Sequence, residues 1–143
     1  MLEILYPRRC AVCDEIEVTG KGICPLCKDK VHVAGEPACK KCGKPLVDER
    51  KEFCTDCGKK HHVYTQGKAV FVYEGGIRNS MYRFKYGNKR EYAEFYANAA
   101  VEKYGVWLNK IKAEVLIPIP MYSRKKRLRG YNQAEVFARE LGR

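Results

Sequence analysis

The chain has 143 residues and a mass of 16.5 kDa, with 45% hydrophobic and 31% charged residues. This composition excludes a disordered chain, and the length allows one ordinary domain or two small ones. Lysine and arginine total 28 against 17 acidic residues, so the formal net charge is +11. Such a charge favours a nucleic acid, an anionic lipid or a polyphosphate as a partner. If the cysteines bind two zinc ions as thiolates, the net charge falls to about +7 and the chain stays basic.

Apolar runs are short throughout the chain. The longest, Val115–Tyr122, has eight residues, far fewer than the roughly 20 that cross a bilayer. The N-terminal run Met1–Leu5 is interrupted by Glu3 and stopped by Pro7, so it is too short for a secretory signal. We therefore expect no transmembrane helix and a cytoplasmic location.

The cysteines form four Cys-x-x-Cys pairs, all within the first 57 residues. They are Cys10, Cys13, Cys24, Cys27, Cys39, Cys42, Cys54 and Cys57, and intervals of 10, 11 and 11 residues separate the pairs. Two residues between cysteines let both sulfurs reach one tetrahedral ion at about 2.3 Å. Four pairs therefore predict two structural zinc ions, each held by four thiolates. A site closed by four thiolates has no position for a substrate, so these ions would hold the fold together.

Other uses of the cysteines fit less well. A disulfide scaffold needs an oxidising compartment, and a redox Cys-x-x-Cys normally occurs once, in a thioredoxin-like context. Iron or an iron–sulfur cluster is the main remaining alternative to zinc. Sequential pairs could share an ion as tandem ribbons, or alternate pairs could form a cross-brace; we favour tandem ribbons because they close locally. We expect His32, His61 and His62 to be solvated and not to bind metal.

The composition changes after His62. The run Lys68–Tyr73 predicts a strand, and Gly75-Gly76 ends it. Ile77, Met81 and Phe84 have helical spacing, and Gly87-Asn88 closes that helix. A second helix is predicted from about Lys89 to Tyr104, with Gly105 as its stop. Its apolar positions are Tyr92, Phe95, Tyr96, Ala99 and Ala100.

Basic and aromatic residues alternate along the first of these helices. They are Arg78, Tyr82, Arg83, Lys85, Tyr86, Lys89 and Arg90. Such a pattern fits a groove for single-stranded nucleic acid, where bases stack on rings and cations follow phosphates. We favour the simpler interpretation, an amphipathic helix whose charges are solvated and whose tyrosines cover the core.

The C-terminal part predicts a buried strand at Val115–Pro120, a basic loop and a helix. The loop contains Arg124, Lys125, Lys126, Arg127 and Arg129, and Gly130-Tyr131-Asn132-Gln133 follows. The helix has Ala134, Phe137, Ala138 and Leu141 as its apolar face, and Asn132 to Glu135 resembles an N-terminal cap. This order places backbone N–H groups and positive charge together, which is typical of an anion site. A solvated turn or a nonspecific nucleic-acid patch explains the basic run equally well.

Several motifs in the same order resemble the ComF family of competence-associated, GntX-type proteins. The four cysteine pairs resemble that family's double zinc ribbon, and Tyr73–Arg78 and Phe84–Asn88 resemble its Tyr-Glu-Gly and Lys-Tyr-x-Gly stretches. Ile117–Met121 stands where the family has a Pro-Val-Pro-Leu strand end. Arg129–Ala134 looks like its Arg-Gly-Phe-Asn-Gln-Ala signature, with Tyr131 in place of the usual Phe.

The resemblance implies a zinc-ribbon domain followed by the N-terminal portion of a type I phosphoribosyltransferase fold, an α/β fold. We expect a double zinc ribbon over residues 1–62 and the incomplete α/β domain over residues 63–143. In that fold the loop here spanning Met121–Gln133 contacts the pyrophosphate of 5-phosphoribosyl 1-pyrophosphate (PRPP), bound with Mg²⁺. Cofactor contacts are thus implied for Arg129, Gly130, Tyr131, Asn132 and Gln133.

One part of the family pattern is missing. The acidic pair and glycine-rich loop that bind the ribose and 5-phosphate do not occur before Arg143. We therefore expect an N-terminal portion of a longer parent, in which alone PRPP and Mg²⁺ would bind, and we assign no catalytic residue.

Two hypotheses for function remain. The chain is part of a phosphoribosyltransferase-like protein linked to natural competence, or it is a non-catalytic zinc-ribbon adaptor for single-stranded DNA or a helicase. The predicted DNA contacts are Arg124, Lys125, Lys126, Arg127, Arg129, Lys85 and Tyr82.

Overall fold

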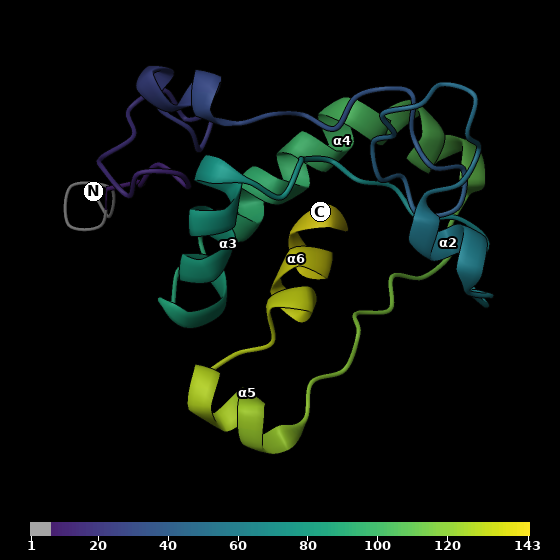
Figure 1. Cartoon of the computed structure of the whole chain (residues 1–143). Coiled ribbons are helices and arrows are strands. Elements are labelled where there is room, and N and C mark those ends of the chain that lie inside the picture. The colour runs from purple at the N-terminus through teal and green to yellow at the C-terminus, as the bar shows by residue number, and fades with distance from the viewer. Residues whose placement is uncertain (1–6) are drawn as a thin grey trace.

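The computed structural model describes residues 7–143, so the apolar run at Met1–Leu5 lies outside the described residues. Within the described range the regular elements are helices, joined by long irregular segments (Figure 1). They are η1 (Pro25–Lys30), α2 (Thr55–Lys59), α3 (Gly75–Tyr86), α4 (Tyr92–Ile111), α5 (Ser123–Arg129) and α6 (Gln133–Leu141). None of the helices in this range is long and apolar enough to span a membrane.

Pairing between extended segments is limited to isolated bridges in residues 7–143. Arg9 pairs with Ile16, Val33 with Phe71, and Ala38 with Pro45. The fold is thus mostly helical, and the α/β phosphoribosyltransferase fold stays a prediction.

Helix α3 follows its predicted apolar spacing. Ile77 and Phe84 are both 3% exposed, and Met81 packs beside them against the same core. The helix ends at Gly87, whose N–H donates to the Arg83 carbonyl at 2.7 Å. The prediction for this element is confirmed.

Helix α4 is longer than predicted. It continues through Gly105 to Ile111, where Lys112 adopts a left-handed φ of 46°. A glycine inside a helix costs about 1 kcal/mol relative to alanine, which flanking contacts readily outweigh. Here the Tyr104 and Trp107 rings contact each other, with Lys68 over both. The prediction that Gly105 stops the helix was therefore wrong.

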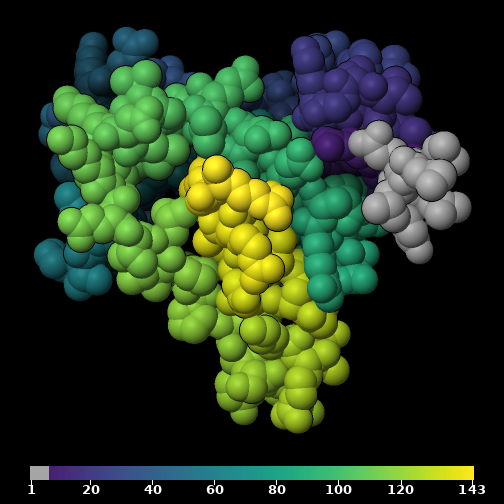
Figure 2. Space-filling model, turned by 180° about the vertical axis from the view of Figure 1, so that it is seen from behind, coloured from purple at the N-terminus to yellow at the C-terminus, as the bar shows by residue number. Residues whose placement is uncertain are grey.

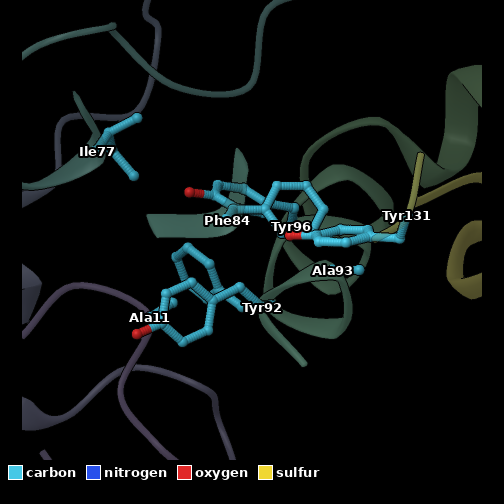
Figure 3. Packing of buried hydrophobic residues seen from close by; sticks show 8 residues of the cluster. Ala11, Ile77, Phe84, Tyr92, Ala93, Tyr96 and Tyr131 are labelled. Carbon is cyan, nitrogen blue, oxygen red and sulfur yellow. The ribbon is translucent and has the colours of Figure 1, made fainter. Parts of the chain in front are cut away.

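One aromatic core joins the two halves of the chain (Figure 3). Helix α4 contributes Tyr92, Phe95 and Tyr96, and the Ser80 hydroxyl lies 2.6 Å from the Tyr96 hydroxyl inside it. Ala11, from the first cysteine pair, is completely buried in this cluster. The expected boundary between residues 62 and 63 stays a prediction, and the core itself includes residues from both sides of it.

Neither of the two predicted strands forms a regular strand in the structure. Lys68–Tyr73 is extended but pairs only briefly, with the Ala34 N–H donating to Val70 and the Val72 N–H donating to His32, each at 2.9 Å. Val115–Pro120 forms no strand and is mostly solvent-exposed; Ile117 is 81% exposed. A strand needs neighbours to satisfy its backbone groups, and the described part of the chain offers this segment none.

The basic segment also differs from its prediction. It forms the helix α5 and not a loop, and it ends at Gly130 with a φ of 81°. The following helix, α6, begins as predicted: the Asn132 side chain accepts a hydrogen bond from the Ala134 N–H at 3.0 Å. The apolar face of α6 packs against α4, with Phe137 half-buried beside the core.

Tyr131 introduces a defect into this core. It is 4% exposed, and its hydroxyl has no hydrogen-bond partner among the described residues. Burial also raises the pKa of this phenol. Phenylalanine at this position would have the same shape without the polar atom.

We expect Tyr131→Phe to stabilise the chain by about 1–3 kcal/mol, because an unsatisfied buried polar group carries a desolvation cost of that order. Denaturant unfolding of the two proteins measures the difference. A loss of stability in the Tyr131→Phe variant would show that the hydroxyl is bonded in solution.

Candidate metal centres

The eight cysteines gather into two groups of four. Cys10, Cys13, Cys24 and Cys27 form the first group, and Cys39, Cys42, Cys54 and Cys57 form the second. Within each group all sulfurs lie within 4.8 Å of one another. Each ribbon is thus built from two consecutive pairs, which confirms the tandem arrangement over the cross-brace.

The sulfur spacing fits tetrahedral zinc. Zinc–sulfur bonds of about 2.3 Å place the sulfurs of a tetrahedron about 3.8 Å apart. The Sγ atoms of Cys13 and Cys24 are 3.7 Å apart, as are those of Cys42 and Cys54. A disulfide would require about 2.05 Å, and all eight cysteines are free of such bonds. Four convergent soft donors are the ligand set of a structural zinc site, and no histidine of the described residues joins either group.

The first pair of each ribbon lies in the same backbone turn. The Cys10 N–H donates to Glu15 and the Asp14 N–H donates back to Cys10, at 2.8 and 2.9 Å. In the second ribbon the Cys39 N–H donates to Lys44 and the Gly43 N–H donates back to Cys39, both at 2.8 Å. Each turn is flanked by one of the isolated bridges, between Arg9 and Ile16 or between Ala38 and Pro45. The ribbons are therefore structural repeats.

This turn requires a left-handed residue four positions after its first cysteine. Gly43 takes that place with a φ of 75°, and Asp14 with a φ of 69°. A Cβ on Gly43 would lie 2.7 Å from the Ala69 nitrogen, so the second ribbon also needs glycine for space. In the first ribbon a non-glycine residue, Asp14, adopts this left-handed conformation, which is uncommon but more frequent for aspartate than for most residues.

The second pair of each ribbon begins a short helix. Cys24 and Cys54 have similar extended conformations and directly precede η1 and α2. The Cys27 N–H donates to Cys24 at 3.0 Å, and the Gly58 N–H donates to Cys54 at 2.9 Å. These turns bring the second pair of sulfurs back to the first.

Backbone N–H groups favour the thiolate at the first cysteine of each ribbon. Burial raises the pKa of Cys10, but hydrogen bonds from the backbone of Cys13, Cys24 and Val12 outweigh it and lower the pKa to about 7. The N–H groups of Val12 and Cys24 each lie 3.4 Å from the Cys10 sulfur. The same balance of burial and backbone hydrogen bonds lowers the pKa of Cys39 to about 6. Thiolates are the form that zinc binds.

Asp14 links the first ribbon to the helices, a role that sequence analysis missed. Its carboxylate accepts a hydrogen bond from the Tyr92 hydroxyl and pairs with the Lys89 ammonium, both at 2.7 Å. Burial raises the pKa of Asp14, but these two partners lower it below its usual value. Arg83 adds a second link by donating to the Val12 carbonyl at 2.7 Å. An acidic residue where the other ribbon has glycine was the available signal.

The predicted nucleic-acid residues lie on α3 and α5, which meet at their C-terminal ends. Arg124 to Arg127 are exposed, Arg129 and Lys85 are half-buried, and Tyr82 is 65% exposed. The Arg129 guanidinium lies 4.7 Å from the centre of the Tyr86 ring, which in turn lies 5.1 Å from the Tyr82 ring. The structure thus brings these residues onto neighbouring elements.

The side chains of the predicted pyrophosphate loop are largely engaged in the fold. Tyr131 is in the core, and Asn132 both caps α6 and donates to the Ile119 carbonyl at 3.0 Å. Arg129 donates to the Gln133 side chain, while the Gly130 carbonyl accepts from Arg90 at 3.1 Å. The assignment of this loop to PRPP stays a prediction.

Comparison with known proteins supports the zinc-binding part. Residues 1–58 match the family described as the double zinc ribbon domain. Neither the curated proteins nor the solved structures compared with this chain contain a significant match. The N-terminal region is therefore a zinc-binding module, and its two four-cysteine groups fit two structural zinc ions.

Proposed function

We propose that the chain is a zinc-stabilised module that binds single-stranded nucleic acid and belongs to a ComF-like protein. The observation that carries this proposal is helix α5, which has five cations in seven residues and no acidic residue. The helix projects from the rest of the molecule (Figures 1 and 2).

The charge on α5 is poorly compensated. Among the described residues its ion pairs are limited to one, between Lys126 and Glu135 at 3.2 Å. Like charges three and four positions apart destabilise a helix, and a helix of seven residues is marginal on its own. A polyanion bound along α5 would relieve this repulsion. The adjoining exposed rings of Tyr82 and Tyr86 favour a nucleic acid over other polyanions, because bases can stack on them.

The zinc ions serve this function indirectly. Each is closed by four thiolates and so offers no position for a substrate. Their role is to keep the two ribbons folded, and the first ribbon in turn shares the core of α3 and α4.

The ComF-like resemblance extends the proposal to a longer parent protein. In that parent we propose the predicted loop Arg129–Gln133 as a partial pyrophosphate contact and a competence helicase as a further partner. A cytoplasmic location agrees with eight reduced cysteines.

We expect binding to single-stranded DNA to weaken steeply with salt, because each neutralised phosphate releases counterions. The triple change Arg124→Gln, Lys125→Gln and Arg127→Gln should weaken binding to all sequences about equally. It should also reduce the slope of log K against log salt by about 2, since each lost phosphate contact contributes about 0.7. Fluorescence anisotropy with a labelled oligonucleotide measures both quantities.

A charge-matched control is Lys51→Gln, Lys59→Gln and Lys60→Gln. These lysines are exposed on the second ribbon, and their replacement lowers the net charge by the same amount. Equal loss of affinity in both triple variants would show that net charge alone, and not α5, attracts DNA. Unchanged affinity in the α5 variant would refute the proposed site.

A further inference from the structure

Three tyrosines on and beside α3 are unusually exposed. Tyr73, Tyr82 and Tyr86 have exposed fractions of 61%, 65% and 62%. By contrast, Tyr92, Tyr96 and Tyr131 in the same part of the chain are all at most 6% exposed. Our favoured sequence interpretation, that the tyrosines of this helix cover the core, is therefore wrong for Tyr82 and Tyr86; Ile77 and Phe84 do so instead.

The exposed tyrosines are connected to one another. Tyr73 and Tyr82 line one open hollow together with Arg78 and Asn79. From there Tyr82 and Tyr86, four residues apart on one helix face, have ring centres 5.1 Å apart and planes tilted by 47°. At the other end of this row of rings, the Arg129 guanidinium lies over the Tyr86 ring.

The charges along these rings favour an anionic occupant. Arg78 lies at the hollow, Arg129 at the opposite end, and α5 continues the positive charge beyond Arg129. Rings without cations would suit any apolar ligand, and cations without rings would suit any polyanion. Alternating rings and cations fit a chain whose bases stack while its phosphates pair.

We propose that Tyr73, Tyr82 and Tyr86 form a base-stacking track that makes the module select unpaired single strands over duplexes. This inference rests on the proposed nucleic-acid function and deepens it: α5 attracts the phosphates, and the track holds the bases. A duplex offers no free base faces to these rings, so it binds through charge alone.

The test compares three labelled probes of equal length by anisotropy: oligothymidylate, the same backbone with abasic sites, and a duplex. Oligothymidylate should bind the unmodified chain most tightly. Tyr82→Ala should weaken that binding by about 5- to 150-fold while leaving the salt slope unchanged, because a stacking contact and no phosphate contact is lost. Tyr82→Ala should leave binding of the abasic strand unchanged, and Tyr82→Phe should retain tight binding of oligothymidylate.

Tyr64→Ala is the matched control, since Tyr64 is an exposed tyrosine that follows the second ribbon in the sequence and belongs to neither α3 nor α5. It should bind all three probes as the unmodified chain does. Circular dichroism and zinc content of each variant confirm that folding is retained.

Equal binding of the base-containing and abasic strands overturns the track. If the α5 triple variant binds more weakly in the same titration, the proposed nucleic-acid function still stands. Absence of binding to every probe at low salt overturns both. Competition by polyglutamate as effective as that by oligothymidylate also overturns the track and indicates an acidic protein as the partner.

Discussion

Cys10→Ser is expected to unfold helices α3 and α4 together with the first ribbon, whereas Cys39→Ser is expected to unfold the second ribbon alone. Structural zinc contributes about 10–16 kcal/mol of binding free energy in small domains, comparable to or larger than the whole stability of most domains. Loss of one ligand should therefore unfold every part of the fold that depends on that ion. The two ribbons differ in how much of the helical part depends on them.

The first ribbon is part of the main core. Ala11 lies inside the aromatic cluster, and Ile23 and Val31 pack against both that cluster and the buried group of Cys10, Val12 and Cys27. Hydrogen bonds from Arg83 and Tyr92 and the ion pair with Lys89 bind the same turn to α3 and α4. Unfolding this ribbon would expose the centre of the helical part.

The second ribbon contacts α4 indirectly, through the segment that contains Lys68 and Ala69. Gly43 packs against Lys68 and Ala69, and Ala69 in turn accepts from the Tyr104 hydroxyl at 2.8 Å and from Lys103 at 3.2 Å. Its buried cysteines belong to neither core cluster. The main core therefore survives when this ribbon unfolds.

Amide hydrogen exchange resolves the two outcomes segment by segment. In Cys39→Ser, protection should be lost over residues 38–60 and kept in α3 and α4. In Cys10→Ser, protection should be lost in the first ribbon and in both α3 and α4. The same pattern of lost protection in both variants would contradict the asymmetry.

Tyr92→Ala is the second change expected to have a large effect, a loss of about 3–5 kcal/mol in the free energy of unfolding. Tyr92 is 1% exposed at the centre of the core, and truncating a large buried ring leaves a cavity of that cost. The change also removes one of the two partners of the Asp14 carboxylate. Both effects act on the contact between the first ribbon and α4.

Two variants separate packing from hydrogen bonding. Tyr92→Phe keeps the ring and removes the hydroxyl, so it should cost about 1.5–3 kcal/mol, as for a hydrogen bond to a charged group. Tyr73→Ala removes an equally large but exposed ring and should change stability by no more than about 0.5 kcal/mol. Denaturant unfolding measures all three. A cost below about 1 kcal/mol for Tyr92→Ala would mean that the ribbon and helices do not share a core.

Local patterns in the sequence predicted the local structure. The Cys-x-x-Cys spacing identified the sulfur groups because each pair closes within one turn, and each ribbon closes over a short interval. Helix α3 followed from the spacing of Ile77, Met81 and Phe84, and the cap at Asn132 from its residue type. Each of these features depends on residues close in sequence.

Features that depend on distant residues were not predictable in this way. Val115–Pro120 has the composition of a buried strand, but a strand forms only beside another, and in the described chain this segment is exposed. Asp14 meets Lys89 and Tyr92 across more than seventy residues. The acidic residue in this turn marks the position as unusual, but nothing in the local sequence identifies its two partners. The extension of α4 through Gly105 likewise depends on rings that pack against Lys68.

The metal content of the purified chain tests the central claim most directly. Native mass spectrometry of protein prepared without added zinc, compared with the same sample denatured in acid, gives the number and identity of bound ions. Eight thiolates in two closed groups predict two zinc ions per chain, lost only on unfolding. One ion per chain, or iron in place of zinc, would contradict the account of two tandem zinc ribbons.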